Sequence, residues 1–515
     1  MMLTAVAGAV GVFAPLQARA AVDWLTYGFD TQRSSDNPDE TVLSPATVSG
    51  LIRSWSFDAG KNDATLTPPL AEATGQIGGQ PLYISNVTIG GLAENLILFG
   101  DGNGVVYALS VSPTTPAGNV IWYQSVGYIT VAHGTSTKQI GIRSALTVDR
   151  TANGGRGAVY VPLNGVVHAL DLPTGAELAG WPISVLEPNP PQTDGAVHDA
   201  ANVSNGQLYI GTAGYDDDYP PYFGRITSIN TATAAVSGTW FPLSGGATMP
   251  TVSGGGVWGW GGVAIDPSAS VGGVYVATGN SKGGNGQLAY AENIVNLAPD
   301  LVMVGAATPA FGKTQNGYDN DYGSTPTLFQ PNGCGQKYLA AESKTGQLVI
   351  DSVAADGTLS VAQSLLVSAG DGSFIGTVAW DPDDQLLLLT SREAGPAPYQ
   401  AGLIALQVSA GCGTPLFSLA WQTGEVTGTG IPVGVGLSSP TYANGLAYLG
   451  AGGSKSNAFA VATGSGSSYV PGQILWTSAS MSGVANITPT VVNGQLFVGT
   501  QAPGHSVFAY KLPSK

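Results

Sequence analysis

The sequence predicts an all-β protein, an eight-bladed β-propeller, on three observations. A short apolar run, a Gly-containing turn and a second apolar run recur along the chain, most clearly in residues 158–183. Gly makes up 74 of 515 residues, as many turns with positive φ require. Charged residues make up 10%, against about a quarter in typical globular proteins, which favours sheets packed face to face.

The number of blades follows from the second apolar run of each repeat. These runs are roughly 50 to 70 residues apart, a spacing typical of propeller blades. They start near Val105, Val166, Ile226, Ile294, Leu348, Leu403, Ala458 and Val507. Because neighbouring blades bury one continuous core, we expect residues 21–515 to form a single propeller domain.

Strand positions within the repeats predict how the ring closes. The second repeat places its strands at 143–149, 158–162 and 166–171 and around Trp181. The last repeat has strands at 488–492, 495–499 and 507–511, after which the chain ends without a fourth. Residues 51–57 read as a fourth strand with no blade before it. Joining the two ends would complete blade eight and leave no open sheet edge.

A Trp recurs in the fourth strand of six repeats, which predicts a structural layer of indoles between neighbouring sheets. These residues are Trp55, Trp122, Trp181, Trp240, Trp421 and Trp476.

The N-terminus and the charge predict a secreted or periplasmic protein. Residues 1–20 read as a signal peptide, with an apolar run and an Ala18-Arg19-Ala20 cleavage site, although no Lys or Arg precedes that run. No later stretch is long and apolar enough for a membrane span. The 17 Lys and Arg against 33 Asp and Glu argue against nucleic acid as a partner.

The two cysteines allow two interpretations. Cys334 would lie between the first and second strands of blade five, and Cys412 between the third and fourth strands of blade six. Those loops share one face of a propeller, so a disulfide between adjacent blades is predicted for an exported protein. The alternative is two free thiols. The sequence has no CxxCH motif for c-type haem.

The Ala169-x-Asp171…Gly175…Trp181 pattern resembles the tryptophan-docking motif of propellers that bind pyrroloquinoline quinone (PQQ), the quinoprotein alcohol dehydrogenase-like superfamily. The resemblance covers nearly the whole chain after residue 20 and implies an eight-bladed fold. It does not by itself imply catalysis, because the superfamily includes assembly scaffolds without a cofactor.

The resemblance implies site residues in residues 257–280. There Trp260 matches the Trp under the quinone, and Asn280 matches a calcium ligand of the family. An indole can stack on a flat quinone, and an amide oxygen suits a hard ion. The alternatives are channel packing for Trp260 and a turn for Asn280.

Two further segments carry family positions. In residues 316–329, Asp319 matches the catalytic base, also a metal ligand, and Asp321 the acidic residue two positions later. Lys344 matches the basic residue that hydrogen-bonds the reactive quinone carbonyls and would stabilise developing negative charge. The alternatives are ordinary turns and strand caps.

In each blade, the connection before the first strand and the connection between the second and third strands lie on the same face of the ring. The four family positions named above fall in such connections, so we expect them at one mouth of the central channel. Arg143 and His198 fall in the same set and are expected to bind the cofactor. The family's calcium glutamate aligns with Tyr219, so Asp218 is the nearest carboxylate for the metal.

Two functions remain open at this point. The first is a PQQ- and Ca²⁺-dependent dehydrogenase that oxidises an alcohol or sugar and passes electrons to an external acceptor. The second is a non-enzymatic PQQ-like propeller that binds a protein or a glycan.

Overall fold

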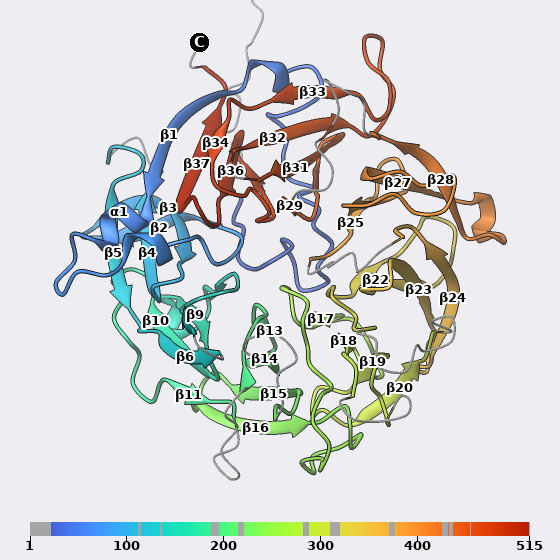
Figure 1. The fold of residues 1–515 in the computed structure, drawn as a ribbon, viewed down its shortest axis with the longest axis horizontal. Coiled ribbons are helices and arrows are strands. Elements are labelled where there is room, and N and C mark those ends of the chain that lie inside the picture. Colours follow the sequence, from blue (N-terminus) through green and yellow to red (C-terminus); the bar gives the residue numbers. More distant parts are fainter. Residues whose placement is uncertain are drawn as a thin grey trace, which may run out of the picture.

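The computed structural model describes residues 22–111, 115–133, 136–186, 195–214, 221–281, 288–309, 320–369, 376–424, 431, 436–453 and 455–513. The predicted signal peptide lies outside these ranges. The described strands form eight antiparallel sheets arranged as blades of a ring (Figure 1), so the predicted eight-bladed fold is confirmed. The strands of each blade are lettered from A, the innermost, to D, the outermost.

The first four blades follow the chain in order. Blade 1 contains β2 (Leu82–Ile89), β3 (Leu92–Gly100), β4 (Val105–Ser110) and β5 (Val120–Ser125). Blade 2 contains β8 (Thr147–Asp149), β9 (Ala158–Leu163), β10 (Val166–Asp171) and β11 (Ile183–Ser184). Blade 3 contains β12 (Gly195–Ala196), β13 (Asn202–Ser204), β14 (Gln207–Gly214), β15 (Arg225–Asn230) and β16 (Ala235–Trp240). Blade 4 contains β17 (Ala264–Ile265), β18 (Val274–Ala277), β19 (Ile294–Leu297) and β20 (Met303–Ala307).

The other four blades complete the ring. Blade 5 contains β21 (Thr327–Phe329), β22 (Lys337–Glu342), β23 (Gln347–Val353) and β24 (Leu359–Leu366). Blade 6 contains β25 (Ala379–Asp381), β26 (Leu386–Ser391), β27 (Gly402–Val408) and β28 (Phe417–Gln422). Blade 7 contains β29 (Gly436–Leu437), β30 (Thr441–Ala443), β31 (Leu446–Gly452), β32 (Lys455–Ala462), β33 (Ile474–Thr477) and β34 (Met481–Ser482). Blade 8 contains β35 (Thr490–Val492), β36 (Gln495–Gly499), β37 (Ser506–Lys511) and β1 (Ile52–Asp58).

The remaining elements are short. They are the hairpin β6 (Ile129–His133) and β7 (Ser136–Ile140), the helix α1 (Ala59–Asp63), and the 3₁₀ turns η1 (Val48–Gly50), η2 (Glu72–Thr74), η3 (Asn153–Gly155) and η4 (Ala410–Cys412). Within the described residues no helix is long and apolar enough to cross a membrane.

Strand β1 closes the ring from the other end of the chain. It pairs antiparallel with β37, from Ile52 opposite Lys511 to Asp58 opposite Ser506. The last blade thus takes three strands from the C-terminal region and one from the N-terminal region. This pairing uses the edge of β37 that would otherwise be exposed.

Residues 22–37, which we call the axial segment, cross the middle of the ring (blue in Figure 1). Hydrogen bonds join this segment to every blade. The partners, in order of blades, are Tyr83, Val148, Asn202, Ile265, Leu328, Trp380, Tyr442 and Val491. Six of them lie on the single A strands of their blades, and Asn202 and Tyr442 lie on β13 and β30, which pair with the second strands of blades 3 and 7. The axial segment therefore lines the inner wall of the ring.

Arg33 fixes the axial segment at blades 3 and 4. Its fully buried guanidinium donates to Thr26 Oγ1, Tyr27 O, Val263 O and Ala201 O at 2.7 to 3.2 Å. Burial lowers the pKa of Arg33 to about 10. Because carbonyl dipoles surround the charge, the cation is tolerated in the interior.

The predicted disulfide is confirmed. Cys334, in the connection between β21 and β22, is bonded to Cys412 of η4, with a Cα–Cα distance of 5.4 Å. The bond joins blade 5 to blade 6 on one face of the ring.

Candidate functional site

The indole of Trp258 lies at the centre of a group of polar side chains from blades 3, 4 and 5. The His198 ring is 5.4 Å from it, the Tyr222 ring 5.8 Å in an edge-on arrangement, and Lys344 Nζ 5.4 Å. A cation at this distance from an indole face is favourable. Among the described residues, the buried Nε1 of Trp258 has no hydrogen-bond partner.

Lys344 and Asp321 form a buried ion pair beside this indole. Lys344 Nζ lies 2.9 Å from Asp321 Oδ2, and the two side chains are 18% and 0% exposed. The Lys344 N–H also donates to the Asp321 carbonyl at 2.8 Å. Asp321 therefore fixes Lys344 twice. Its carbonyl holds the Lys344 backbone, and its carboxylate holds the ammonium.

Asn280 joins the pair from the connection between β18 and β19. Its N–H donates to Asp321 Oδ1 at 2.5 Å, and its carbonyl accepts from Gly255 N–H at 2.7 Å. Its side-chain Oδ1 is buried and has no hydrogen-bond partner within the described part of the chain. A buried amide oxygen without a donor costs free energy unless a ligand satisfies it.

Gly279 makes this close approach possible. A Cβ at that position would lie 2.3 Å from Asp321 Oδ1 and 2.7 Å from Trp258 Nε1. Any side chain there would displace the carboxylate or the indole. The glycine thus lets Asp321 and Trp258 meet beside the Asn280 backbone.

His198 and Asp199 border the group from blade 3. His198 Nε2 is hydrogen-bonded to the Gly214 carbonyl, which can only accept, so Nε2 carries the proton. Asp199 is fully buried, and one of its oxygens accepts from Gly211 N–H at 2.8 Å. Burial raises the pKa of Asp199 well above its usual range, although the hydrogen bond from Gly211 and the charge of Arg33 act in the opposite direction.

Trp260 lies apart from these contacts, against the axial segment. It is half-buried on a cluster of Tyr27, Ala145 and Ala200, and its carbonyl accepts from Ala200 N–H at 2.7 Å. Tyr27 Oη also lies 3.1 Å from Thr488 Oγ1 of the last repeat. Since blades 2, 3 and 8 all contribute to this cluster, Trp260 lies near the axis of the ring.

The other predicted site residues are not joined to this group by the contacts between described residues. Arg143 is half-buried between β7 and β8, with its backbone near Gly78. Asp319 and Asp218 lie outside the described residues. The structure therefore brings together Asn280, Lys344 and His198 of the predicted set.

Sequence reasoning missed Trp258 and gave Asp321 no role. Trp258 and Trp260 are two residues apart in a Gly-rich stretch, as are Asp319 and Asp321 in theirs. The pattern alone could not say which member of each pair contacts Lys344.

Comparison with known proteins shows the fold. No family model matches the sequence, and no curated protein matches it. Among solved structures, the quinohaemoprotein alcohol dehydrogenase of Comamonas testosteroni superposes with a TM-score of 0.62 at 16% identity, covering 96% of this chain and 81% of that one. A europium-containing methanol dehydrogenase superposes with a TM-score of 0.64 at 16% identity, covering 95% and 98%. Quinohaemoprotein alcohol dehydrogenase ADHIIG of Pseudomonas putida HK5 gives 0.62 at 14% identity, covering 96% and 81%.

The chain has the eight-bladed propeller fold of the quinoprotein alcohol dehydrogenases. This likeness extends over nearly the whole chain, as the resemblance in sequence implied.

The geometry defines what the group can do chemically. It offers an indole with a His ring beside it, an ammonium paired with a buried carboxylate, and an amide oxygen that has no hydrogen-bond partner among the described residues. Such a set can bind a planar anionic molecule and a hard cation and can stabilise negative charge on a carbonyl oxygen.

Proposed function

We propose that this protein is a secreted or periplasmic PQQ-dependent dehydrogenase that oxidises an alcohol or a sugar and transfers the electrons to an external acceptor. The observation that carries the proposal is the convergence of Lys344, Asp321 and Asn280 on Trp258. These residues come from separate connections of blades 4 and 5, and the solved dehydrogenases named above share the fold.

The residues present fit a quinone and a metal ion. Asn280 Oδ1 is a buried amide oxygen without a donor among the described residues, and such an oxygen suits a hard metal ion. We propose Asn280, Asp319 and Asp218 as ligands for Ca²⁺ or a lanthanide. We propose Trp260 as the stacking surface for the quinone, with Lys344, Arg143 and His198 at its edge. When bound, the quinone supplies a two-electron acceptor that no side chain provides.

Lys344 and Asp321 have different proposed roles. The Lys344 ammonium, fixed by Asp321, would stabilise negative charge on an acceptor oxygen without first reorienting. Both oxygens of Asp321 already accept hydrogen bonds, one from the Lys344 ammonium and one from the Asn280 N–H. The proton of the substrate hydroxyl is therefore assigned to Asp319, the carboxylate two residues earlier.

Reconstitution tests this proposal. The purified protein is incubated with PQQ and either Ca²⁺ or a lanthanide, quinone retention is measured by calorimetry, and dye reduction is followed over a panel of alcohols and aldoses. We expect quinone retention and turnover with at least one substrate. Asp319→Asn should abolish turnover and retain quinone binding.

Lys337, the first residue of β22, and Lys344, in the connection that follows β22, supply a matched pair of variants. Lys344→Met should lower turnover by about 100-fold or more, because an electrostatic partner of the acceptor oxygen is lost. Lys337→Met removes an ammonium of similar type, 2.5 Å from Asp266, and should leave turnover unchanged. If the wild-type protein retains no quinone with either ion, the enzyme proposal is wrong and the binding-scaffold alternative stands.

A further inference from the structure

Three side chains that can bind a metal lie together beside the strand that closes the ring. They are Asp58, Glu72 and His505, and their ligand atoms, two carboxylate oxygens and an imidazole nitrogen, all lie within 4.8 Å of one another. Zn²⁺ binds such atoms at about 2.0 to 2.2 Å, so the ligands of one ion are up to about 4 Å apart. The spacing of the three side chains is close to that of a zinc site.

The backbone brings Asp58 and His505 together from opposite ends of the chain. Asp58 is the last residue of β1, and it lies opposite Ser506, the first residue of β37. The N–H of Ala59 donates to the His505 carbonyl at 2.9 Å. The two side chains are therefore neighbours because β1 completes blade 8, whatever their own interactions are.

Two glycines let Glu72 approach this pair. Glu72 is the first residue of η2, which packs against α1. A Cβ on Gly60 of α1 would overlap the Glu72 carbonyl oxygen and lie 2.8 Å from Cγ of His505. A Cβ on Gly75 would lie 2.6 Å from the Cα of Gly60. Larger residues at these two positions would push the three side chains apart.

The charges of the group are incompletely balanced. Nδ1 of His505 lies 2.6 Å from Asp58 Oδ1, and the Lys61 ammonium lies 3.0 Å from Asp58 Oδ2. Lys61 is 71% exposed, so its ammonium is free to move into solvent. Glu72 is exposed, and its carboxylate has no hydrogen-bond or ion-pair partner in the described part of the chain. A cation between the three side chains would balance both carboxylates.

The interior side of α1 adds further negative charge. Asp63, the last residue of α1, and Asp101 of blade 1 are both fully buried, and Asp101 Oδ2 has no hydrogen-bond partner among the described residues. Asp63 accepts hydrogen bonds from the neutral groups of Asn103 and Tyr107. Within the described ranges no Lys or Arg forms an ion pair with these two buried acids, so their field favours a cation near α1.

We propose that Asp58, Glu72 and His505 bind Zn²⁺, with water completing the coordination of the ion. An imidazole nitrogen together with carboxylates suits Zn²⁺, whereas Ca²⁺ and Mg²⁺ prefer oxygen ligands alone. The ion would tie the N-terminal closing strand and η2 to blade 8. This site shares no residue with the candidate functional site and does not depend on the proposed dehydrogenase activity.

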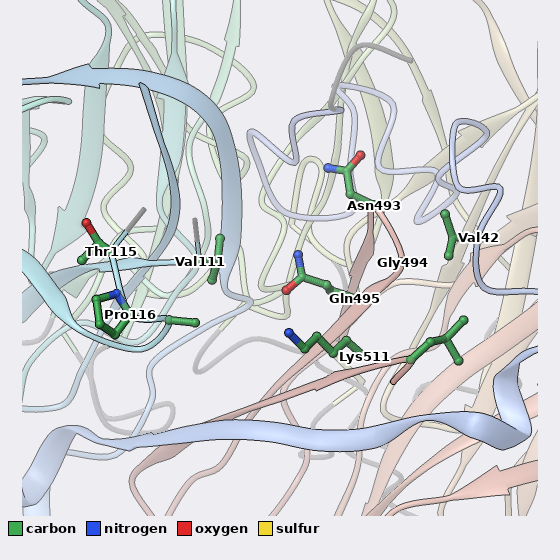
Figure 2. A pocket seen from close by; sticks show the side chains of 10 residues that line it. Val42, Val111, Thr115, Pro116, Asn493, Gly494, Gln495 and Lys511 are labelled. Carbon is green, nitrogen blue, oxygen red and sulfur yellow. The ribbon is translucent and has the colours of Figure 1, made fainter. Parts of the chain in front are cut away.

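Two other places provide internal comparisons. His168 also has a carboxylate beside Nδ1, with Glu177 Oε2 at 2.8 Å, but it belongs to no group of three such side chains among the described residues. At the far end of the closing strand pair, Lys511 borders a groove of about 550 Å³ between blades 8 and 1 (Figure 2). The described residues that line this groove include no Asp, Glu, His or Cys. We expect Zn²⁺ at neither place.

The experiment uses the full-length protein, freed of metal by a chelator and without quinone. Zn²⁺ affinity and stoichiometry are measured by competition with a chromogenic chelator. We expect one tightly bound ion whose affinity falls by about 100-fold or more in His505→Gln and in Glu72→Gln, because each loses a ligand. His168→Gln, the matched control, should bind Zn²⁺ as the wild type does. Because Glu72 is exposed, Glu72→Gln keeps the fold, and its loss of binding reports the ligand alone.

Two further measurements separate an ion from a purely structural contact. Lys61→Met should bind Zn²⁺ a few-fold more tightly, because the ammonium no longer competes for Asp58. Zn²⁺ should raise the Tm of the wild type and leave the Tm of His505→Gln and Glu72→Gln unchanged, because the ion binds the folded state. Equal Zn²⁺ affinity in the wild type and Glu72→Gln overturns the proposal. Displacement of the bound Zn²⁺ by an equal concentration of Ca²⁺ also overturns it, because His505 would then not be a ligand.

Discussion

The interface between blades 1 and 2 and the interface between blades 2 and 3 occupy equivalent places in the ring but are built differently. The first buries Trp122 over Gly175 and satisfies its Nε1 with a backbone carbonyl. The second has Ala179 and Ala234 at the same two positions, and its own indole, Trp181, packs beside Tyr160 against the apolar cluster between the two blades. The difference teaches that the repeat sets the backbone, whereas single residues decide where the indole of each interface packs.

The largest expected effect comes from removing the docked indole at the interface between blades 1 and 2. Trp122→Ala should lower the free energy of unfolding by about 4 kcal/mol, because a buried indole and its hydrogen bond are lost and a cavity remains. Trp181→Ala, at the interface between blades 2 and 3, should lower the free energy of unfolding by about 1 kcal/mol, since that ring is half-buried. Guanidinium denaturation of both variants measures the difference. Equal losses would contradict the comparison.

The interface between blades 5 and 6 adds a covalent joint. The disulfide closes a loop of 78 residues, and its removal should lower the free energy of unfolding by about 3 kcal/mol, mainly through the entropy of the unfolded chain. Cys412→Ser, compared with the oxidised wild type by denaturation, measures this. A free thiol at Cys334 in the variant confirms that the bond is gone. An unchanged midpoint would show that packing alone holds the two blades together.

The interface between blades 4 and 5 contains a buried acid. Asp351 is fully buried, neither of its oxygens has a partner among the described residues, and burial raises its pKa to about 7. Burial, and then the charges of Asp351 and Glu292, raise the pKa of Tyr322 at the same interface.

This acid should make the protein less stable as the pH rises. Between pH 5 and 7 the folded state keeps a proton on Asp351 that the unfolded state has released, so the free energy of unfolding falls by about 2 kcal/mol. The loss ends above the folded-state pKa. Asp351→Asn should remove that part of the pH dependence, measured by urea denaturation at pH 5 and 8. A variant with the same pH dependence as the wild type would assign the effect to another buried acid.

The repeats could be predicted from the sequence because each blade is specified locally. Alternating apolar residues and Gly turns placed the C strands correctly, so β4, β10 and β19 begin at Val105, Val166 and Ile294 as expected. The fourth strand of blade 2 was expected around Trp181 but begins at Ile183. Pro182 follows the Trp and has no N–H to give to the sheet.

The axial segment and the site could not be predicted in the same way. The axial segment is held by backbone hydrogen bonds to strands up to several hundred residues away, such as Asn37 to Val491, and no periodic pattern marks it. The roles predicted for Lys344 and Asn280 stay predictions, and the structure shows only that both residues contact Asp321 in the candidate site. Its centre at Trp258 and Asp321 depends on Gly279 allowing a close approach, which only the tertiary structure shows.

The smallest effect, and the sharpest for the comparison, comes from rebuilding the second interface on the pattern of the first. Ala179→Trp combined with Ala234→Gly places a Trp four residues after Gly175 and a Gly on the next blade, as Trp122 and Gly175 stand at the interface between blades 1 and 2. The indole should bury its faces between blades 2 and 3 and donate to the Thr231 carbonyl, which raises the free energy of unfolding by about 1 kcal/mol. The gain is modest because the new Gly also gains freedom in the unfolded chain. Ala234→Gly alone should lower stability slightly, and thermal unfolding of the two variants separates these contributions. If the double variant is less stable than Ala234→Gly, the backbones of blades 2 and 3 are not spaced to receive an indole, and the two interfaces differ in more than their side chains.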